Sequence, residues 1–233
     1  RQVYKPYGWL SDAQWRRRAE TALATIVLRP RWETFRVSEH PRLPELEGRA
    51  LAELARERGR SPFDALCEIA LEHDQRPRFR QTLGNDDVEG VSWLLTREGC
   101  VLGLSDAGAH VGQLCDAPMP TDLLGRWVRE RGVLPLEKAV HKLTGEPAAL
   151  FGLRDRGGLR PGAFADVVVF DPETVAPGPT RRVRDFPADA ERLTADAPLG
   201  MTHLLVNGTP IRENGVSLHA TLERRPGRLP ELG

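Results

Sequence analysis

The chain has 233 residues, and its 33 basic side chains balance 33 acidic ones, which argues against a surface for nucleic acid or for an anionic membrane. No apolar run reaches the length of a membrane-spanning helix and no signal peptide is recognisable, so we expect no contact with a membrane. The three cysteines, Cys67, Cys100 and Cys115, are odd in number and lack CxxC spacing, which favours a reducing cytoplasm over a disulfide framework or a structural zinc site.

Residues 11–150 show a pattern in which predicted helices alternate with short predicted strands. Capping residues mark several helix ends, such as Gly59 after one helix and Ser61, followed by a proline, before the next. This alternation is typical of a parallel sheet or barrel. In chain order, the pattern predicts a helix from Ser11 to about Ala22, strand-like runs over 25–28 and 32–37, and helices over 48–58, 61–71 and 85–95.

The next predicted strand, 100–104, leads into a glycine-rich loop, and residues 102–112 read LGLSDAGAHVG. After this loop we expect Thr121 to cap a helix that runs to Arg131. A further helix over 136–143 is expected to stop at Gly145. The predicted strand would therefore present the polar residues of the loop at its carboxyl end.

From about residue 155 the pattern changes to one rich in β-structure. Residues 165–170, ADVVVF, form an apolar strand, whereas residues 173–200 are rich in proline and arginine and lack a clear periodicity. Asn207-Gly208 separates two short β-runs over 202–206 and 209–212, which predicts a tight hairpin. A second turn pair, Asn214-Gly215, precedes another short run over 216–218.

Three polar residues of the glycine-rich loop, Ser105, Asp106 and His110, are the candidate functional residues. A carboxylate and an imidazole at the end of a buried strand suggest a site, but Asp106 fits the role of a turn or helix cap equally well on local grounds. His110 either contacts a ligand, steadies Asp106, or is an exposed loop histidine. Ser105 fits packing or hydrogen bonding better than nucleophilic attack, because no G-x-S-x-G elbow surrounds it. From the residues alone these alternatives stay open.

Four longer stretches carry a family resemblance: GLSDAGAH, KLTGEPAALFGLRDRGGLRPGAFADVVVFDP, ELEGRALAELARERGRSPFDALCEIALEHD and HLLVNGTPIRENG. They resemble the metal-dependent amidohydrolase superfamily and, within it, the N-acyl-D-amino-acid deacylase (D-aminoacylase) branch. The resemblance extends over the chain from about Trp32. It implies an α/β fold in which residues 1–154 are the C-terminal part of a (β/α)8 TIM-type barrel. Residues 155–233 would be the C-terminal half of a small β-sandwich followed by a tail.

The resemblance also implies a reaction, the hydrolysis of non-peptide carbon–nitrogen bonds. Asp106 would end the eighth barrel strand, where it binds or faces a divalent metal, expected to be zinc. It would take a proton from the attacking water and return it to the leaving amine. His110 and Ser105 would contact the substrate, a small N-acyl amino acid or a related amide.

Most of the family's site residues are not found in this chain. The family pattern also uses an H-x-H pair, a cysteine, glutamate or modified lysine, and two further histidines. A complete barrel takes about 250 residues, so we expect residues 1–154 to require a missing N-terminal segment of the same protein. The start at Arg1, without a methionine, agrees with this expectation. The chain alone is expected to be inactive, and its oligomeric state is left open.

The loop also departs from the better-known D-aminoacylases, which use an arginine after this aspartate to hold the substrate carboxylate. Residues 111–120, VGQLCDAPMP, contain no arginine, and the first one downstream is Arg126, in a predicted helix. The acyl-D-amino-acid substrate is therefore open. Two other functions remain: an inactive relative that serves as a binding or assembly module, and another superfamily enzyme such as a cyclic-amide hydrolase or a deaminase.

Overall fold

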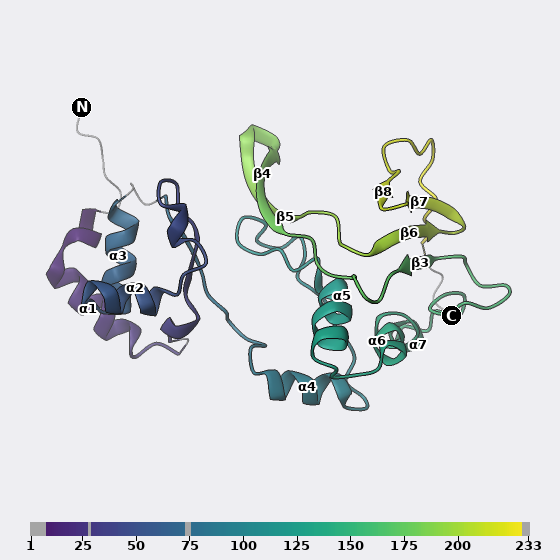
Figure 1. The fold of residues 1–233 in the computed structure, drawn as a ribbon, viewed down its shortest axis with the longest axis horizontal. Coiled ribbons are helices and arrows are strands. Elements are labelled where there is room, and N and C mark those ends of the chain that lie inside the picture. Colours follow the sequence, from purple (N-terminus) through teal and green to yellow (C-terminus); the bar gives the residue numbers. More distant parts are fainter. Residues whose placement is uncertain (1–7, 28, 73–75, 230–233) are drawn as a thin grey trace. The chain divides into compact units, whose positions relative to one another are not determined.

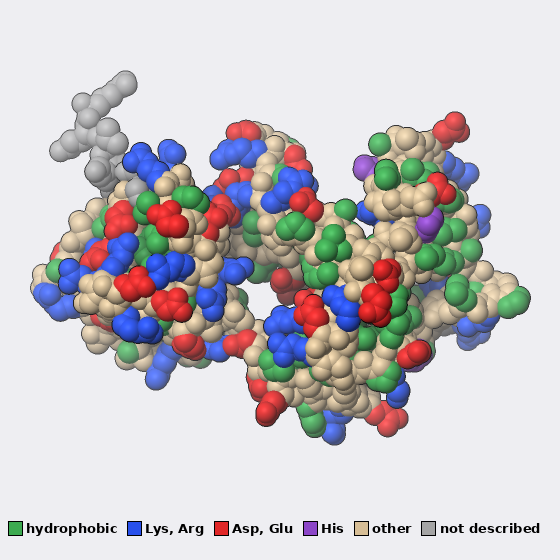
Figure 2. All heavy atoms as spheres, viewed as in Figure 1, with side chains coloured by type: hydrophobic (Ala, Val, Ile, Leu, Met, Phe, Trp, Pro, Cys, Tyr) green, Lys and Arg blue, Asp and Glu red, His purple; other side chains and the backbone are tan. Residues whose placement is uncertain are grey.

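The computed structural model describes residues 8–27, 29–72 and 76–229, and the chain forms two compact units, Arg1–Val88 and Glu89–Gly233 (Figure 1). The domain boundary expected at 154/155 lies within the second unit and stays a prediction. Both helices and strands are present, as an α/β class requires. Basic and acidic side chains are interspersed over both units on the face shown in Figure 2, in keeping with the net charge of zero. In the described ranges, every helix is too short or too polar to cross a membrane.

The first helix of the first unit, α1, spans Ala13–Leu23. Its cap is Asp12, whose carboxylate accepts hydrogen bonds from the backbone N–H groups of Gln14 and Trp15 at 2.7 and 3.3 Å. Ser11, the predicted cap, lies instead in a short 3-10 turn over Gly8–Ser11. The helix is therefore confirmed, but its start is one residue later than predicted.

The helices α2 (Leu51–Arg58) and α3 (Pro62–Glu72) follow the predicted ranges closely. Gly59 ends α2 with a φ of 63°, a left-handed conformation that glycine adopts without steric cost. The Ser61 hydroxyl accepts a hydrogen bond from the Asp64 N–H at 3.2 Å, which confirms it as the cap of α3. Local capping chemistry thus fixes where both helices begin and end.

Two short antiparallel strands, β1 (Arg36–Glu39) and β2 (Arg78–Arg80), complete the first unit. The run 25–28 was predicted as a strand, but residues 25–27 form turns and bends, and Leu28 lies outside the described residues. The core packs α2 and α3 against β1 and the neighbouring 3-10 turn. Its buried members are Val37, Leu46, Leu51, Leu54, Ala55, Ala65 and Ile69.

Helices α4 to α7 occupy the first half of the second unit (Figure 1). Thr121, the predicted cap, lies inside the helical region, and its hydroxyl donates to the Pro118 carbonyl at 2.9 Å. Thr144, rather than Gly145, ends α6, and α7 follows directly. The bounds are α4 Val88–Thr96, α5 Met119–Asp122, which continues as a π-helical segment over Leu123–Glu130, α6 Leu136–Leu143 and α7 Gly145–Leu150.

The parallel strand predicted over 100–104 is not formed, and that prediction is wrong for this structure. A strand of a parallel sheet is buried between neighbouring strands, which accept and donate its backbone hydrogen bonds. Within the described ranges, every strand pairing is antiparallel and none includes this segment. Leu102 packs against the core of the second unit, but Leu104 is 84% exposed. The run is therefore apolar, as expected, but the described residues include no strand that pairs with it.

A four-stranded antiparallel sheet in the order β3-β6-β7-β8 confirms the β-rich region (Figure 1). Its strands are β3 (Val167–Phe170), β6 (Met201–Val206), β7 (Thr209–Glu213) and β8 (Val216–Ser217). Asn207-Gly208 joins β6 to β7, and Asn214-Gly215 joins β7 to β8. All four turn residues have positive φ, between 48° and 79°. This is the geometry that tight hairpins require and that Asn-Gly pairs favour.

A second hairpin, β4 (Thr180–Phe186) with β5 (Ala190–Ala195), lies in the stretch where no periodicity was recognised. Ion pairs join its two strands and its flank: Arg184–Glu191 at 3.4 Å, Arg192–Asp185 at 2.7 Å and Arg181–Asp196 at 2.5 Å. These strands bury few apolar side chains, so the hydrophobic pattern does not reveal them. Their stability comes from backbone pairing and cross-strand charge pairs instead.

The core of the second unit joins its helices to the segment that follows β3. Val175, in that segment, is fully buried, and the Arg129 guanidinium donates to its carbonyl oxygen at 2.5 Å. The other buried members come from the helices and their connections: Leu95, Leu123, Leu124, Trp127, Leu134 and Ala139. The sheet and the helices of this unit therefore share one hydrophobic core.

Gly178 makes the closest backbone approach next to the β4–β5 hairpin. A Cβ atom at this position would clash with the carbonyl oxygen of Asp196 and lie 2.6 Å from that of Ala197. Because the obstacles are backbone atoms, Gly178→Ala is expected to lower the free energy of unfolding by about 1–3 kcal/mol. Urea denaturation measures this change. Gly158→Ala is the control, because a Cβ there meets open space, and equal effects of the two variants would contradict the assignment.

Candidate functional site

The candidate residues lie on an irregular loop between α4 and α5. Asp106 is exposed and has a φ of 54°, a left-handed conformation that aspartate tolerates better than most residues. Its carbonyl oxygen accepts a hydrogen bond from the Ala109 N–H at 3.1 Å, which closes a turn over 106–109. Asp106 therefore holds its carboxylate on a turn at the surface.

His110 follows at the end of the same turn. It is exposed and has a φ of 45°, and its carbonyl oxygen accepts from the N–H groups of Gln113 and Leu114 at 2.7 and 3.1 Å. Ser105 is half-buried. The loop thus brings all three candidates into one short segment, although within the described part of the chain no hydrogen bond joins any two of their side chains.

A divalent metal would need more ligands than this loop provides. Among residues 8–27, 29–72 and 76–229, no group of three or more His, Cys, Asp or Glu side chains is arranged to hold a metal ion. A catalytic zinc typically takes three protein ligands in addition to water. The described residues alone therefore do not fit a complete zinc site, and Asp106 stands as one candidate ligand.

The contacts that hold this loop in place were not predicted from the sequence. The Leu193 N–H, on β5, donates to the Val111 carbonyl oxygen at 2.7 Å. The Arg182 guanidinium, on β4, donates to the Gly112 carbonyl oxygen at 3.1 Å. At the start of the segment, Lys142 Nζ donates to the Cys100 carbonyl oxygen at 2.5 Å. The strands read TRRVRDF and AERLTA, in which charged residues are frequent without strict alternation, so their sequences carry little signal for a hairpin.

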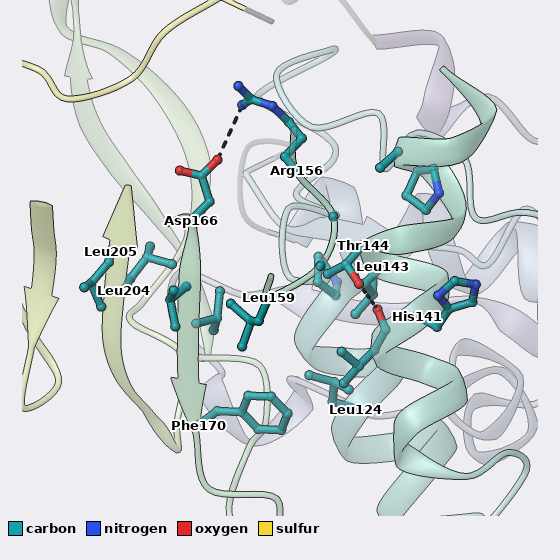
Figure 3. A pocket seen from close by; sticks show the side chains of 18 of the residues that line it. Leu124, His141, Leu143, Thr144, Arg156, Leu159, Asp166, Phe170, Leu204 and Leu205 are labelled. Atoms are coloured by element: carbon teal, nitrogen blue, oxygen red, sulfur yellow. Dashed lines mark hydrogen bonds and ion pairs between the residues drawn. The ribbon is translucent and has the colours of Figure 1, made fainter. Parts of the chain in front are cut away.

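The second unit also contains an apolar cleft of about 890 Å³ (Figure 3). Helices α6 and α7 line one side, and β3 and β6 line the other, with Leu143, Leu159, Phe170 and Leu204 among the side chains that face it. Ser105, Asp106 and His110 are not among its lining residues. The cleft is therefore separate from the candidate site.

The charged groups at one end of this cleft are paired within the fold. The Arg156 guanidinium lies 3.4 Å from an Asp166 carboxylate oxygen, as the dashed line in Figure 3 marks. The other Asp166 oxygen accepts from the Asn207 N–H at 2.7 Å. Asp166 thus ties the start of β3 to the β6–β7 turn and to the loop after α7. These groups serve the structure of the unit.

The sequence shares extended similarity with deacylases of D-amino-acid derivatives. It is 37% identical over 174 residues to the D-aminoacylase of Alcaligenes xylosoxydans xylosoxydans, covering 72% of this chain and 31% of that protein. It is 37% identical over 194 residues to the N-acyl-D-glutamate deacylase of the same organism, covering 80% and 34%. The chain therefore spans about a third of the length of these curated relatives.

The chain is also similar to one solved structure, and one family pattern matches it. The structure is the N-acyl-D-glutamate deacylase from Bordetella bronchiseptica complexed with zinc and a phosphonate inhibitor. It is 31% identical, with 84% of this chain and 36% of that chain covered and a TM-score of 0.44. The pattern of the amidohydrolase family matches residues 13–211, which is most of the chain. The chain belongs to the amidohydrolase family.

Proposed function

We propose that this chain forms part of a metal-dependent hydrolase that removes the acyl group from N-acyl-D-amino acids. The observation that carries the proposal is the similarity over 72–80% of the chain to two proteins that are both deacylases of D-amino-acid derivatives. The exposed loop carrying Asp106, His110 and Ser105 is the proposed position of the reaction. We propose a cytoplasmic location on the basis of the cysteine content.

Asp106 is the proposed proton acceptor and donor. As a water oxygen attacks the acyl carbon, a carboxylate oxygen of Asp106 takes the proton that the water loses. The same group then delivers this proton to the amide nitrogen as the carbon–nitrogen bond breaks, which releases a carboxylic acid and a free amino acid. A divalent ion, with zinc as our proposal, would supply polarisation of the water and of the acyl oxygen. His110 and Ser105, which flank the turn, would contact the substrate.

The remaining ligands and barrel strands are proposed to come from an N-terminal segment of a longer polypeptide. In this proposal residues 1–154 complete a (β/α)8 barrel, and residues 155–233 contribute to a small β-sandwich. The exposed Leu104 supports the idea, because a leucine at the end of a barrel strand is normally covered by neighbouring strands. The apolar run 100–104 would then gain the hydrogen-bonding neighbours that a strand needs.

The test compares the longer polypeptide with the 233-residue chain. Each is assayed for release of free amino acid from N-acetyl-D- and N-acetyl-L-amino acids. Bound zinc is measured by inductively coupled plasma mass spectrometry. We expect the longer polypeptide to hydrolyse the D-substrates and to hold stoichiometric zinc. The 233-residue chain is expected to do neither, because Asp106 supplies one of the three protein ligands that a catalytic zinc typically takes.

The other outcomes distinguish the alternatives. Turnover and stoichiometric zinc in the 233-residue chain would show that it needs no further segment. Hydrolysis of a cyclic amide, but of neither N-acetyl amino acid, would replace the proposal with a cyclic-amide hydrolase. A folded, longer polypeptide that hydrolyses none of these compounds would favour a binding or assembly module.

A further inference from the structure

The loop with the proposed site is attached to the β4–β5 hairpin directly after His110. Val111 and Gly112 are half-buried, whereas residues 106–110 are exposed. The Leu193 N–H donates to Val111 at 2.7 Å, and the Arg182 guanidinium donates to Gly112 at 3.1 Å. Both acceptors are backbone carbonyl oxygens. The two hydrogen bonds therefore fix the path of the loop backbone.

The hairpin is built to make this attachment. Arg182 and Leu193 lie opposite each other in the β4–β5 register. The Leu193 N–H is directed to the loop and not to β4, so the outer edge of β5 pairs with the loop. Arg182 reaches the next carbonyl along the loop from the neighbouring strand. Both strands of the hairpin therefore donate hydrogen bonds to the loop, at two consecutive residues.

Other charged residues of the hairpin join its two strands to each other. Arg192 and Asp185 form two parallel hydrogen bonds, at 2.8 and 2.7 Å. The hairpin is stabilised by its own ion pairs and backbone pairing. It can therefore hold in place a loop whose turns contain residues with positive φ, such as Asp106 and His110.

We propose that Arg182 is a positioning residue, which holds the loop so that the Asp106 carboxylate meets the substrate and its water in a reactive geometry. This inference rests on the proposed function. Arg182 acts through the Gly112 carbonyl and the loop backbone, and not by touching the substrate. Misplacing a reacting group by about 1 Å can cost on the order of 100-fold in rate, so a loop released from the hairpin is expected to lose turnover.

Arg182→Met in the longer polypeptide removes the hydrogen-bond donor and keeps most of the aliphatic stem. We expect kcat for an N-acetyl-D-amino acid to fall by about 10–100-fold, the range seen when groups that orient site residues are removed. KM should change by less than kcat, because only the substrate contacts proposed for His110 and Ser105 move with the loop. Arg182→Lys, which keeps a charged donor on a flexible stem, should recover part of the lost kcat. A rise in KM with unchanged kcat would overturn the positioning role and indicate substrate binding.

A second measurement follows the loop without using activity. Cys115 lies on this loop, and its rate of modification by a thiol reagent, resolved by peptide mass spectrometry, reports how firmly the loop is held. We expect Arg182→Met to raise that rate severalfold. Cys67 is the internal reference, because it is fully buried and burial raises its pKa to about 11. Its rate should stay the same as long as the first unit, which contains it, stays folded.

Arg181→Met is the matched control. Arg181 is the neighbouring residue on β4, is exposed, and pairs with Asp196. We expect this variant to keep both the parent kcat and the parent Cys115 rate. If Arg182→Met fails to fold, Arg182→Gln takes its place, since its amide is too short to reach the same carbonyl.

The outcomes separate this inference from the proposed function. A parent without deacylase activity would refute the function, and the Cys115 rates would still decide whether Arg182 holds the loop. An active parent whose kcat and Cys115 rate are both unchanged in the Arg182 variant would refute the inference and leave the function standing.

Discussion

Asp106→Asn in the longer polypeptide is expected to lower kcat/KM for N-acetyl-D-amino acids by about 10²–10⁴-fold, the usual contribution of a positioned general acid–base group. Asparagine has nearly the same size as aspartate, so the turn over 106–109 should persist. Its amide oxygen accepts protons far more weakly than a carboxylate, so the attacking water would lose its proton acceptor. Steady-state release of the free amino acid measures the effect, and circular dichroism checks that the fold is kept.

The matched control for this variant is Asp116→Asn. Asp116 lies on the same loop and is exposed, so its substitution removes the same charge from the same surface. We expect its kcat/KM to stay close to that of the parent. Two results would count against Asp106 as the proton acceptor: an Asp106→Asn protein within a few-fold of the parent, or equal losses in both variants. Equal losses would show that the rate depends on the negative charge of the loop and not on Asp106 in particular.

Local chemistry explains which parts of the fold the sequence predicts well. The Asn207-Gly208 and Asn214-Gly215 turns depend on residues that accept positive φ, and both form as predicted. Ser61 and Gly59 likewise mark helix ends through their own hydrogen bonds and backbone angles. Such features depend on few neighbouring residues, so the sequence of the segment is sufficient to predict them.

Features that depend on residues far away in the chain are not predicted from the local sequence. An apolar run such as 100–104 becomes a strand only when other strands pair with it, and within the described ranges none does. The β4–β5 hairpin has the opposite problem, because its strands pair through their backbones and through charged side chains that resemble those of a loop. The bond from Arg182 to Gly112 joins residues 70 positions apart. The candidate residues were therefore proposed from their local motif, but the hydrogen bonds that support their loop were not predicted.

Leu51→Ala is expected to lower the free energy of unfolding of the first unit by about 2–5 kcal/mol, the range for removing a buried leucine side chain. Leu51 is the first residue of α2, is 0% exposed, and belongs to the core with Val37, Leu54 and Ile69. Its loss leaves a cavity between α2 and its neighbours, because a close-packed core relaxes only in part. Urea unfolding followed by tryptophan fluorescence measures the change, since Trp32 packs against this core.

Leu83→Ala in the same unit removes the same atoms from a side chain that is 77% exposed. Its expected effect is within about 0.5 kcal/mol, as for most exposed substitutions. The difference between the two changes in unfolding free energy measures the effect of burial, because both variants change leucine to alanine in one compact unit of the chain. If Leu51→Ala unfolds at the same urea concentration as Leu83→Ala, Leu51 does not belong to a packed core. The apolar face of α2 would then have to pack against residues outside this core.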